Sequence, residues 1–149
     1  MPAVDPDNEA TFRVIEIPST LEAARQPEAA ILREVEACGY SDDAVFAIKL
    51  ALEEAMTNAV KHGNGNNPSK RITVRYAVTP EKLVIIVADQ GEGFLPTAIP
   101  DPTSPERLPL PTGRGIMLMR AYMDDVRYRK KGTEVYLMKQ NEPTASGTD

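Results

Sequence analysis

The sequence has few of the residues and segments that define several large classes of protein. It contains one cysteine, Cys38, so neither an intrachain disulfide nor a cysteine-based metal cluster can form. No apolar run in it approaches the roughly 20 residues that a membrane helix needs. Its first ten residues, MPAVDPDNEA, lack the basic and apolar regions of a signal peptide. These absences predict a cytoplasmic protein without a membrane segment.

Positive charge is also scarce. The 17 lysines and arginines are outnumbered by 22 acidic residues, which gives a formal net charge of -5. An acidic protein gains little from non-specific contact with nucleic acid or with an anionic membrane, so neither is an expected partner. One local basic run contains Arg127, Arg129, Lys130 and Lys131. It fits a solvated strand edge and turn better than a binding surface.

The length and composition indicate one globular domain. A chain of 149 residues can bury a sizeable core, and its 42% hydrophobic and 26% charged residues are near the globular average. We expect a flexible leader at residues 1–10, a domain at 11–140 and a disordered tail at 141–149.

Periodicity predicts the order of helices and strands. Period-two alternation indicates strands at 11–18 and 71–79, and the β-branched run at 83–89 fits a central strand covered on both faces. Helices are predicted at 27–38, with Gly39 closing the first, and at 41–62, with Ser41 as the N-cap of the second. Short turns between neighbouring strands favour an antiparallel or mixed sheet with helices on one face, which is an α+β fold.

The C-terminal part adds a long irregular segment. Residues 94–113 contain six prolines and no regular pattern, and a loop of this length inside a domain is usually functional or disordered. A helix is predicted at 115–126, followed by a closing hairpin at 126–139 that turns at Lys131 and Gly132.

The helix at 41–62 carries polar residues in an unexpected place. On a helical wheel Glu54 and Asn58 share a stripe with small alanines, whereas Glu53 points about 100° away. A carboxylate on that stripe could orient or deprotonate a hydroxyl group, and the amide oxygen could complete a Mg²⁺ shell made of phosphates and waters. An ordinary solvated polar stripe explains the helix equally well when the segment is taken alone.

Two glycine-containing segments follow. In ADQGEGF, Asp89 ends the central strand and precedes Gly91 and Gly93, and in TGRGIM, Gly113 and Gly115 precede a helix. A carboxylate at a strand end can accept a hydrogen bond from an amino group such as that of adenine. Glycines at a helix start let backbone N–H groups meet phosphate. Each glycine pair by itself could be only a tight turn, and the sequence has no P-loop.

The segments in this order resemble the GHKL, or Bergerat-type, ATPase superfamily. The resemblance rests on an E-x-x-x-N helix, a D-x-G-x-G segment, a G-x-G before a helix and the closing strand GTEVYL. Within that superfamily, EEAMTNAVKHG and GRGIMLMRAYMDDV are similar to the bacterial anti-sigma factor serine kinases. The resemblance covers residues 11–139.

The resemblance implies a two-layer α/β sandwich, the Bergerat ATP-binding fold, with residues 94–113 as a lid over the nucleotide. It implies that Glu54 is the general base or hydroxyl-orienting carboxylate, that Asn58 coordinates Mg²⁺, and that Asp89 binds the adenine amino group with Thr133 nearby. The remaining expected ATP-binding residues line the pocket or the phosphates: Gly91, Gly93, Gly113, Arg114 and Gly115.

The implied activity is transfer of the γ-phosphoryl group of ATP to a serine or threonine of an anti-anti-sigma protein. Such a kinase is a partner switch that holds either a sigma factor or its unphosphorylated antagonist. Members of the subfamily are commonly dimeric, so a homodimer is among the expected states. Two alternatives remain at this point: a non-catalytic ATP-binding module of the same fold, or an ATPase fragment of a larger machine.

Two residues at the end of the polar helix stay without a firm role. His62 is expected to pack or hydrogen-bond beside the site, since no separate dimerisation helix carries a phosphoacceptor histidine. Lys61 is either a solvated cation at the helix end or a phosphate ligand, and the first reading is favoured.

Overall fold

The computed structural model of the chain describes residues 3–91 and 113–141, with side chains in the second range from residue 118 onward. Its elements follow the predicted order. In chain order they are η1 (Glu9–Thr11), β1 (Arg13–Pro18), α1 (Arg25–Ala37), α2 (Asp42–Thr57), the π-helical turn η2 (Asn58–Gly63), β2 (Arg71–Val78), β3 (Lys82–Ala88), α3 (Gly113–Tyr122), β4 (Asp125–Arg129), η5 (Lys130–Gly132) and β5 (Glu134–Gln140).

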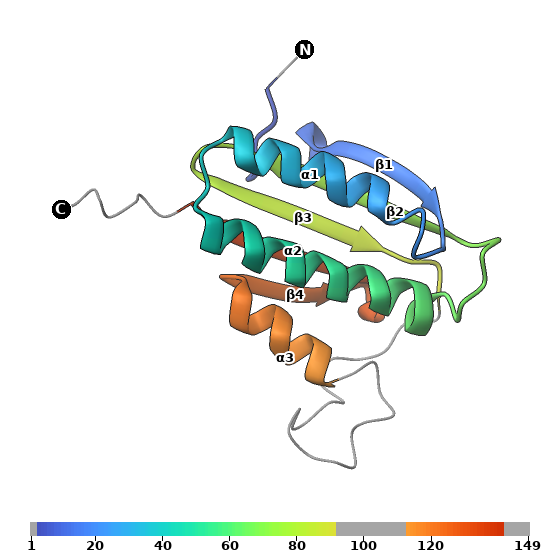
Figure 1. Cartoon of the computed structure of the whole chain (residues 1–149). Helices are drawn as coiled ribbons and strands as arrows, with labels where there is room; N and C mark the ends of the chain where they lie inside the picture. Colours follow the sequence, from blue (N-terminus) through green and yellow to red (C-terminus); the bar gives the residue numbers. More distant parts are fainter. Residues whose placement is uncertain (1–2, 92–112, 142–149) are drawn as a thin grey trace.

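The five described strands form one sheet in the order β1-β2-β3-β5-β4, and every neighbouring pair is antiparallel. The helices α1, α2 and α3 lie together over one face of this sheet (Figure 1). The predicted α+β fold with two layers is therefore confirmed, and the sheet that the sequence left as antiparallel or mixed is antiparallel.

The central strand β3 is covered on both faces, as its unbroken apolar run predicted. One set of its side chains faces the helices and belongs to the main core: Leu83, Ile85 and Val87. The alternate set, Val84 and Ile86, packs in a second cluster with Phe12 and Ala77 on the opposite face. Because both faces exclude water, β3 is a fixed reference for whatever follows its last residue.

The boundary between the first two helices is the one the sequence predicted. Gly39 adopts a φ of +81°, which favours glycine, and the amide of Tyr40 donates to the carbonyl of Val35 (3.4 Å) in a Schellman-type ending. Ser41 then caps α2, because its Oγ accepts from the amide of Ala44 at 3.1 Å.

Two helix ends differ from the prediction. Helix α1 begins at Arg25, so Pro27 lies within the first turn rather than at its first position; the turn tolerates it because its missing N–H would have had no partner. Helix α3 begins at Gly113 and ends at Tyr122, shorter at its end than the predicted 115–126. The chain leaves the helix there because the amide of Asp124 donates to the carbonyl of Met138 at 2.9 Å and joins the sheet.

The segment expected to be a flexible leader makes specific contacts in the structure. Asp5 and Asn8 form a β-bridge, and Asp7 pairs with Lys82 of β3 (2.6 Å). Farther along, Glu9 bridges Arg75 and Arg129 on the sheet face away from the helices. The described part of this segment, residues 3–10, therefore lies against the domain.

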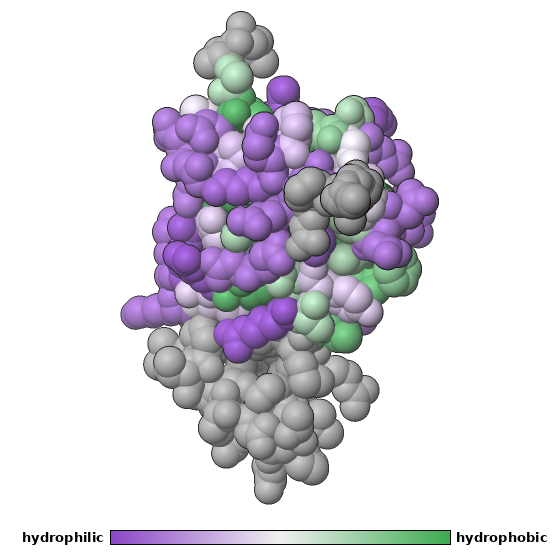
Figure 2. Space-filling model, turned by 90° about the vertical axis from the view of Figure 1, so that its left-hand side faces the viewer, coloured by the Kyte–Doolittle hydropathy of each residue, from purple (hydrophilic) through white to green (hydrophobic). Residues whose placement is uncertain are grey.

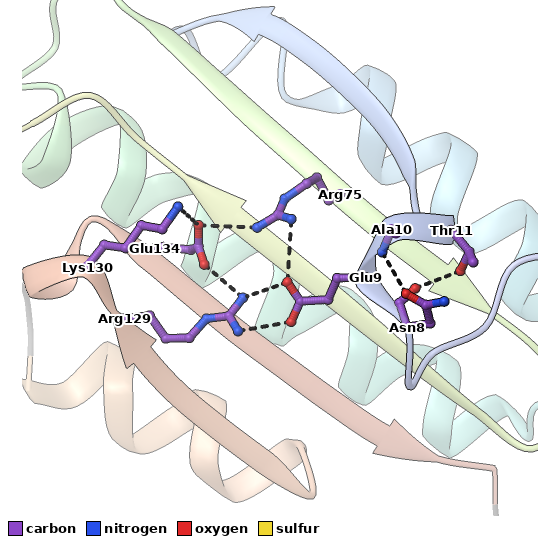
Figure 3. Close-up of polar contacts among 8 residues, drawn as sticks. All are labelled: Asn8, Glu9, Ala10, Thr11, Arg75, Arg129, Lys130 and Glu134. Carbon is purple, nitrogen blue, oxygen red and sulfur yellow. Dashed lines mark hydrogen bonds and ion pairs between the residues drawn. The ribbon is translucent and has the colours of Figure 1, made fainter.

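Glu9 belongs to an ion cluster that joins three strands to the N-terminal segment (Figure 3). Glu134, only 3% exposed, lies 2.8 Å from Arg129 and 3.3 Å from Arg75, with Lys130 at 3.6 Å. The pKa of Glu9 is lowered, chiefly by its hydrogen bond with Arg129. A buried carboxylate is tolerated here because two guanidinium groups compensate its lost hydration.

Figure 2 shows the end of the molecule opposite the π-helical turn that follows α2. The surface there is mainly hydrophilic, with smaller hydrophobic areas between the polar side chains. Within residues 3–91 and 113–141, the helices are all too short or too polar to cross a membrane.

Two acidic side chains meet where α1 packs on α2. Burial raises the pKa of Glu28 from its ordinary 4.5 to about 7, and a hydrogen bond with Glu53 and repulsion from its charge add to the effect. The pKa of Glu28 is higher in the folded protein than in the unfolded chain. Its contribution to stability is therefore present in full below pH 4.5 and is lost as the pH rises through about 7. The contribution of the Glu28–Glu53 contact to stability therefore decreases as the pH rises from weakly acidic to neutral.

We expect Glu28→Gln to be more stable than the wild type at pH 8 by on the order of 1 kcal/mol, after allowance for solvent screening. At pH 5 the gain should be smaller, because Glu28 is then largely protonated in the folded protein. Urea denaturation at the two pH values measures both differences. Glu36→Gln, on an exposed residue of the same helix, is the control. An equal gain at pH 5 and pH 8 would contradict the assignment.

Candidate functional site

Glu54 and Asn58 lie at the end of α2, where the helix changes geometry. Glu54 is in the last turn of α2, and Asn58 is the first residue of the π-helical turn; both are half-buried. Glu53 is exposed and meets Glu28 of α1, whereas the charge of Glu54 acts on Tyr128 of β4. The helical wheel therefore separated the two glutamates correctly.

The π-helical turn Asn58–Gly63 was not predicted, because the sequence pattern indicates an ordinary α-helix as far as Lys61 or His62. The amide of Asn64 donates to the carbonyl of Ala59 at 2.8 Å, five residues back, which widens the turn. Such turns often occur at functional sites because the extra residue shifts the side chains around it. Lys61 and His62 are both exposed on this turn, which supports a solvated Lys61.

The amide group of Asn58 is only partly satisfied. Its nitrogen Nδ2 is buried and has no hydrogen-bond partner among the described residues. The side chain lies within hydrogen-bonding reach of Tyr128, whose own pKa is raised chiefly by burial. An unmet buried polar atom costs about 1–3 kcal/mol, so a protein that retains one commonly has a ligand, ion or water at that place.

Asp89 follows the last residue of β3 and is held on both sides. Its amide donates to the carbonyl of Thr133 at 2.8 Å, and its Oδ1 accepts from the amide of Gly91 at 2.8 Å. Burial raises the pKa of Asp89, while the Gly91 amide and the charge of Lys70 act in the opposite direction. The result is a half-buried carboxylate in a fixed direction, able to accept a hydrogen bond from a ligand.

Two glycines make the close approach between the π-helical turn and the end of β3. A Cβ on Gly63 would overlap the carboxylate of Asp89, and a Cβ on Gly91 would overlap the carbonyl of Gly63. The end of α2 and the end of β3 therefore pack backbone against side chain with no room for a methyl group. This contact, between Gly63, Asp89 and Gly91, is called the glycine–aspartate joint below.

The remaining predicted site residues divide into two groups. Thr133 lies beside Asp89 through its carbonyl, but its hydroxyl donates to the carbonyl of Lys130 at 2.9 Å within the turn before β5. The segment Gly113–Gly115 with Arg114 forms the start of α3, which packs against α2 (Figure 1). Gly93 and the expected lid, apart from residue 113, lie outside the described residues.

Sequence reasoning missed three residues of this region. Gly63 directly follows the helix predicted at 41–62 and precedes an asparagine-rich turn, a place in the sequence that could have marked it. Tyr128 shares with Val126 the strand face that packs on the core, so alternation in the hairpin could have placed it inside. Asn64, which is 2% exposed, carried no signal in the sequence, because two of its three side-chain partners are 45 and 26 positions away.

The class of protein follows from a match to a known domain family. Residues 17–139 match the family described as the histidine kinase-like ATPase domain, and the chain belongs to this family. The match includes Glu54, Asn58, Asp89 and Thr133, the residues that the fold gathers around the end of α2 and the end of β3.

The curated relatives point to one kind of protein within the class. The chain is similar to the "Serine-protein kinase RsbW" of Bacillus licheniformis (40% identical over 98 residues; 60% of this chain and 59% of the relative). It is also similar to the protein of that name from Oceanobacillus iheyensis (34% over 95 residues; 60% of each) and from Listeria monocytogenes serotype 4a (32% over 111 residues; 68% and 69%). In the Bacillus licheniformis and Oceanobacillus iheyensis comparisons, the matched region spans about 60% of the relative's length.

A solved structure supports the fold. The crystal structure of the RsbU and RsbW domains of Rv1364c from Mycobacterium tuberculosis superposes with a TM-score of 0.57 at 19% identity, over 88% of this chain and 33% of that one. At that identity the similarity concerns the fold alone.

A double-mutant cycle tests the glycine–aspartate joint. We expect Gly63→Ala to lower the free energy of unfolding by about 1–3 kcal/mol, because the new methyl group overlaps a carboxylate that cannot move freely. In an Asp89→Ala background the same substitution should cost clearly less, since the overlapping atoms are gone. Urea denaturation of the four proteins gives the coupling. Equal costs in the two backgrounds would show that the overlap is not what excludes a side chain at Gly63.

Proposed function

We propose that the protein is an ATP-dependent serine/threonine kinase that acts as an anti-sigma factor. The observation that supports this most strongly is the arrangement of residues 54–63. They carry the half-buried carboxylate of Glu54 and the amide of Asn58, whose Nδ2 has no hydrogen-bond partner among the described residues, and Gly63 packs against Asp89. Membership of an ATPase domain family and similarity to serine-protein kinases agree with it.

The residues present fit a magnesium–nucleotide complex. The amide oxygen of Asn58 is a ligand type that Mg²⁺ accepts beside phosphates and waters. The buried Nδ2 of the same side chain, which has no hydrogen-bond partner within residues 3–91 and 113–141, is a donor that suits a phosphate oxygen. Asp89 offers an acceptor whose direction is set by the glycine–aspartate joint, as binding of the adenine amino group requires. When bound, Mg²⁺ would neutralise charge on the phosphates.

The phosphates are proposed to lie toward the start of α3. This helix begins at Gly113, and the N-terminus of a helix attracts anions through its free N–H groups and its dipole. Gly113, Arg114 and Gly115 are therefore proposed phosphate neighbours, with Gly91 and Gly93 shaping the pocket and residues 94–113 acting as the lid.

Glu54 is the proposed catalytic residue. Its carboxylate would accept the proton of the incoming serine or threonine hydroxyl, or orient that hydroxyl, as the oxygen forms a bond to the γ-phosphorus and the bond to ADP breaks. Phosphoryl transfer depends mainly on positioning and charge stabilisation, so a Mg²⁺ ligand and one oriented carboxylate can be the only catalytic groups that the protein must supply.

The proposed phosphate acceptor is an anti-anti-sigma protein, and the alternative partner is a sigma factor. The kinase would hold one of them at a time, and phosphorylation would release the antagonist. A homodimer is the proposed assembly. These partners follow from the similarity to RsbW proteins rather than from any surface of the chain.

Glu54→Gln tests the catalytic role. We expect transfer of label from γ-labelled ATP to the anti-anti-sigma protein of the same genome to fall by about 10²–10⁴-fold, because the amide cannot accept the hydroxyl proton. Binding of ATP, measured by calorimetry, should persist. Glu53→Gln changes the neighbouring glutamate, which points to α1, and should leave the transfer rate unchanged.

Two outcomes would contradict the proposal. Full transfer by Glu54→Gln would exclude Glu54 as the catalytic carboxylate. Binding of ATP by the wild type without transfer to the acceptor would instead indicate a nucleotide-regulated binding module of the same fold.

A further inference from the structure

The turn after η2 buries an asparagine that makes three hydrogen bonds. Asn64 is 2% exposed. Its Nδ2 donates to the Oγ of Ser19 (3.0 Å) and to the carbonyl of Arg71 (3.1 Å), and its Oδ1 accepts from the amide of Gln90 (2.8 Å). One side chain thereby ties together the residue after β1, the first residue of β2 and the segment after β3.

The third of these bonds bears on Asp89. The amide of Gln90 belongs to the peptide group that leaves Asp89, and the amide of Asp89 itself is held by the carbonyl of Thr133 at 2.8 Å. The backbone is thus fixed on both sides of the Asp89 Cα, which fixes the direction of its carboxylate. Gln90 is held a second time, since its Oε1 accepts from the amide of Arg71 at 2.6 Å.

Asn64 also connects this carboxylate to the polar helix. It directly follows Gly63, whose missing side chain leaves the space that the Asp89 carboxylate fills. The amide of Asn64 closes the π-helical turn by donating to the carbonyl of Ala59 at 2.8 Å. A displacement of Asn64 would therefore move Asp89 relative to the turn that begins at Asn58.

We propose that Asn64 is a positioning residue that sets the base selectivity of the nucleotide site. It acts through Asp89, by holding the carboxylate where it accepts a hydrogen bond from the 6-amino group of adenine; this inference rests on the proposed nucleotide-binding function. Inosine carries an oxygen at that position, which a carboxylate repels. The site therefore distinguishes ATP from ITP only while Asp89 is held in place.

The test compares ATP and ITP binding by calorimetry in the presence of Mg²⁺. A charge-assisted hydrogen bond contributes enough for the wild type to prefer ATP by about tenfold or more. In Asn64→Ala we expect the preference to fall to about threefold or less, with the affinity for ITP little changed. A purely structural loss would weaken both nucleotides by the same factor, so the ratio of the two dissociation constants separates positioning from stability.

The matched control is Asn67→Ala. Asn67 is an exposed asparagine of the same turn whose side chain bonds to Ser69, and its loss should leave the ratio unchanged. If Asn64→Ala does not fold, as judged by circular dichroism, Asn64→Leu carries the test. Leucine fills the buried space but offers no acceptor to the Gln90 amide, so it should lower the ratio in the same direction.

Two results would overturn the inference. The first is an unchanged ratio of the two dissociation constants in the folded Asn64→Ala protein, or in Asn64→Leu where that variant is used; an equal loss of affinity for ATP and ITP is such a result. It leaves the proposed kinase intact, because the wild type would still bind ATP and transfer its phosphoryl group. The second is a wild type that binds neither nucleotide, which would refute the proposed function as well.

Discussion

In the turn that ends α2, the carboxylate of Asp89 occupies the space that a side chain on Gly63 would need. The helix carrying Glu54 and Asn58 can reach the end of β3 only because of this vacancy. Apolar side chains pack β3 on both faces. This packing fixes the position of Asp89, which directly follows the strand. The distance between the polar helix and the strand-end carboxylate is therefore set by backbone packing, which is stiffer than contact between flexible side chains.

The rest of the domain supports this joint from both faces of the sheet. On the helix side, α1 and α2 pack into the main core, and Tyr128 of β4 lies against Asn58. On the other face, Glu9 and Glu134 pair with Arg75 of β2 and Arg129 of β4, close to the turn that brings Thr133 beside Asp89. The proposed site thus receives residues from α2, β3 and the turn before β5, far apart in the sequence.

Local rules accounted for much of the fold. The cap at Ser41, the ending at Gly39 and the doubly covered β3 depend on residues close in sequence, and the structure has all three. The family was recognised differently, from the resemblance carried by the motifs that contain Glu54, Asn58 and Asp89, and the family match confirms it. Local patterns could not foresee the contacts of Glu9 or the burial of Asn64, because each depends on partners far along the chain. They did not indicate the π-helical turn either, which is closed by the amide of Asn64.

The central claim is that the ends of α2 and β3 form one magnesium–nucleotide site. Calorimetric titration of the wild type and of Asp89→Asn with ATP, each with Mg²⁺ and with EDTA, tests it most directly. We expect the wild type to bind ATP, removal of Mg²⁺ to weaken binding because the ion that Asn58 would hold is then absent, and Asp89→Asn to abolish it. Equal binding by the two proteins, or binding that does not depend on Mg²⁺, would contradict the proposed site.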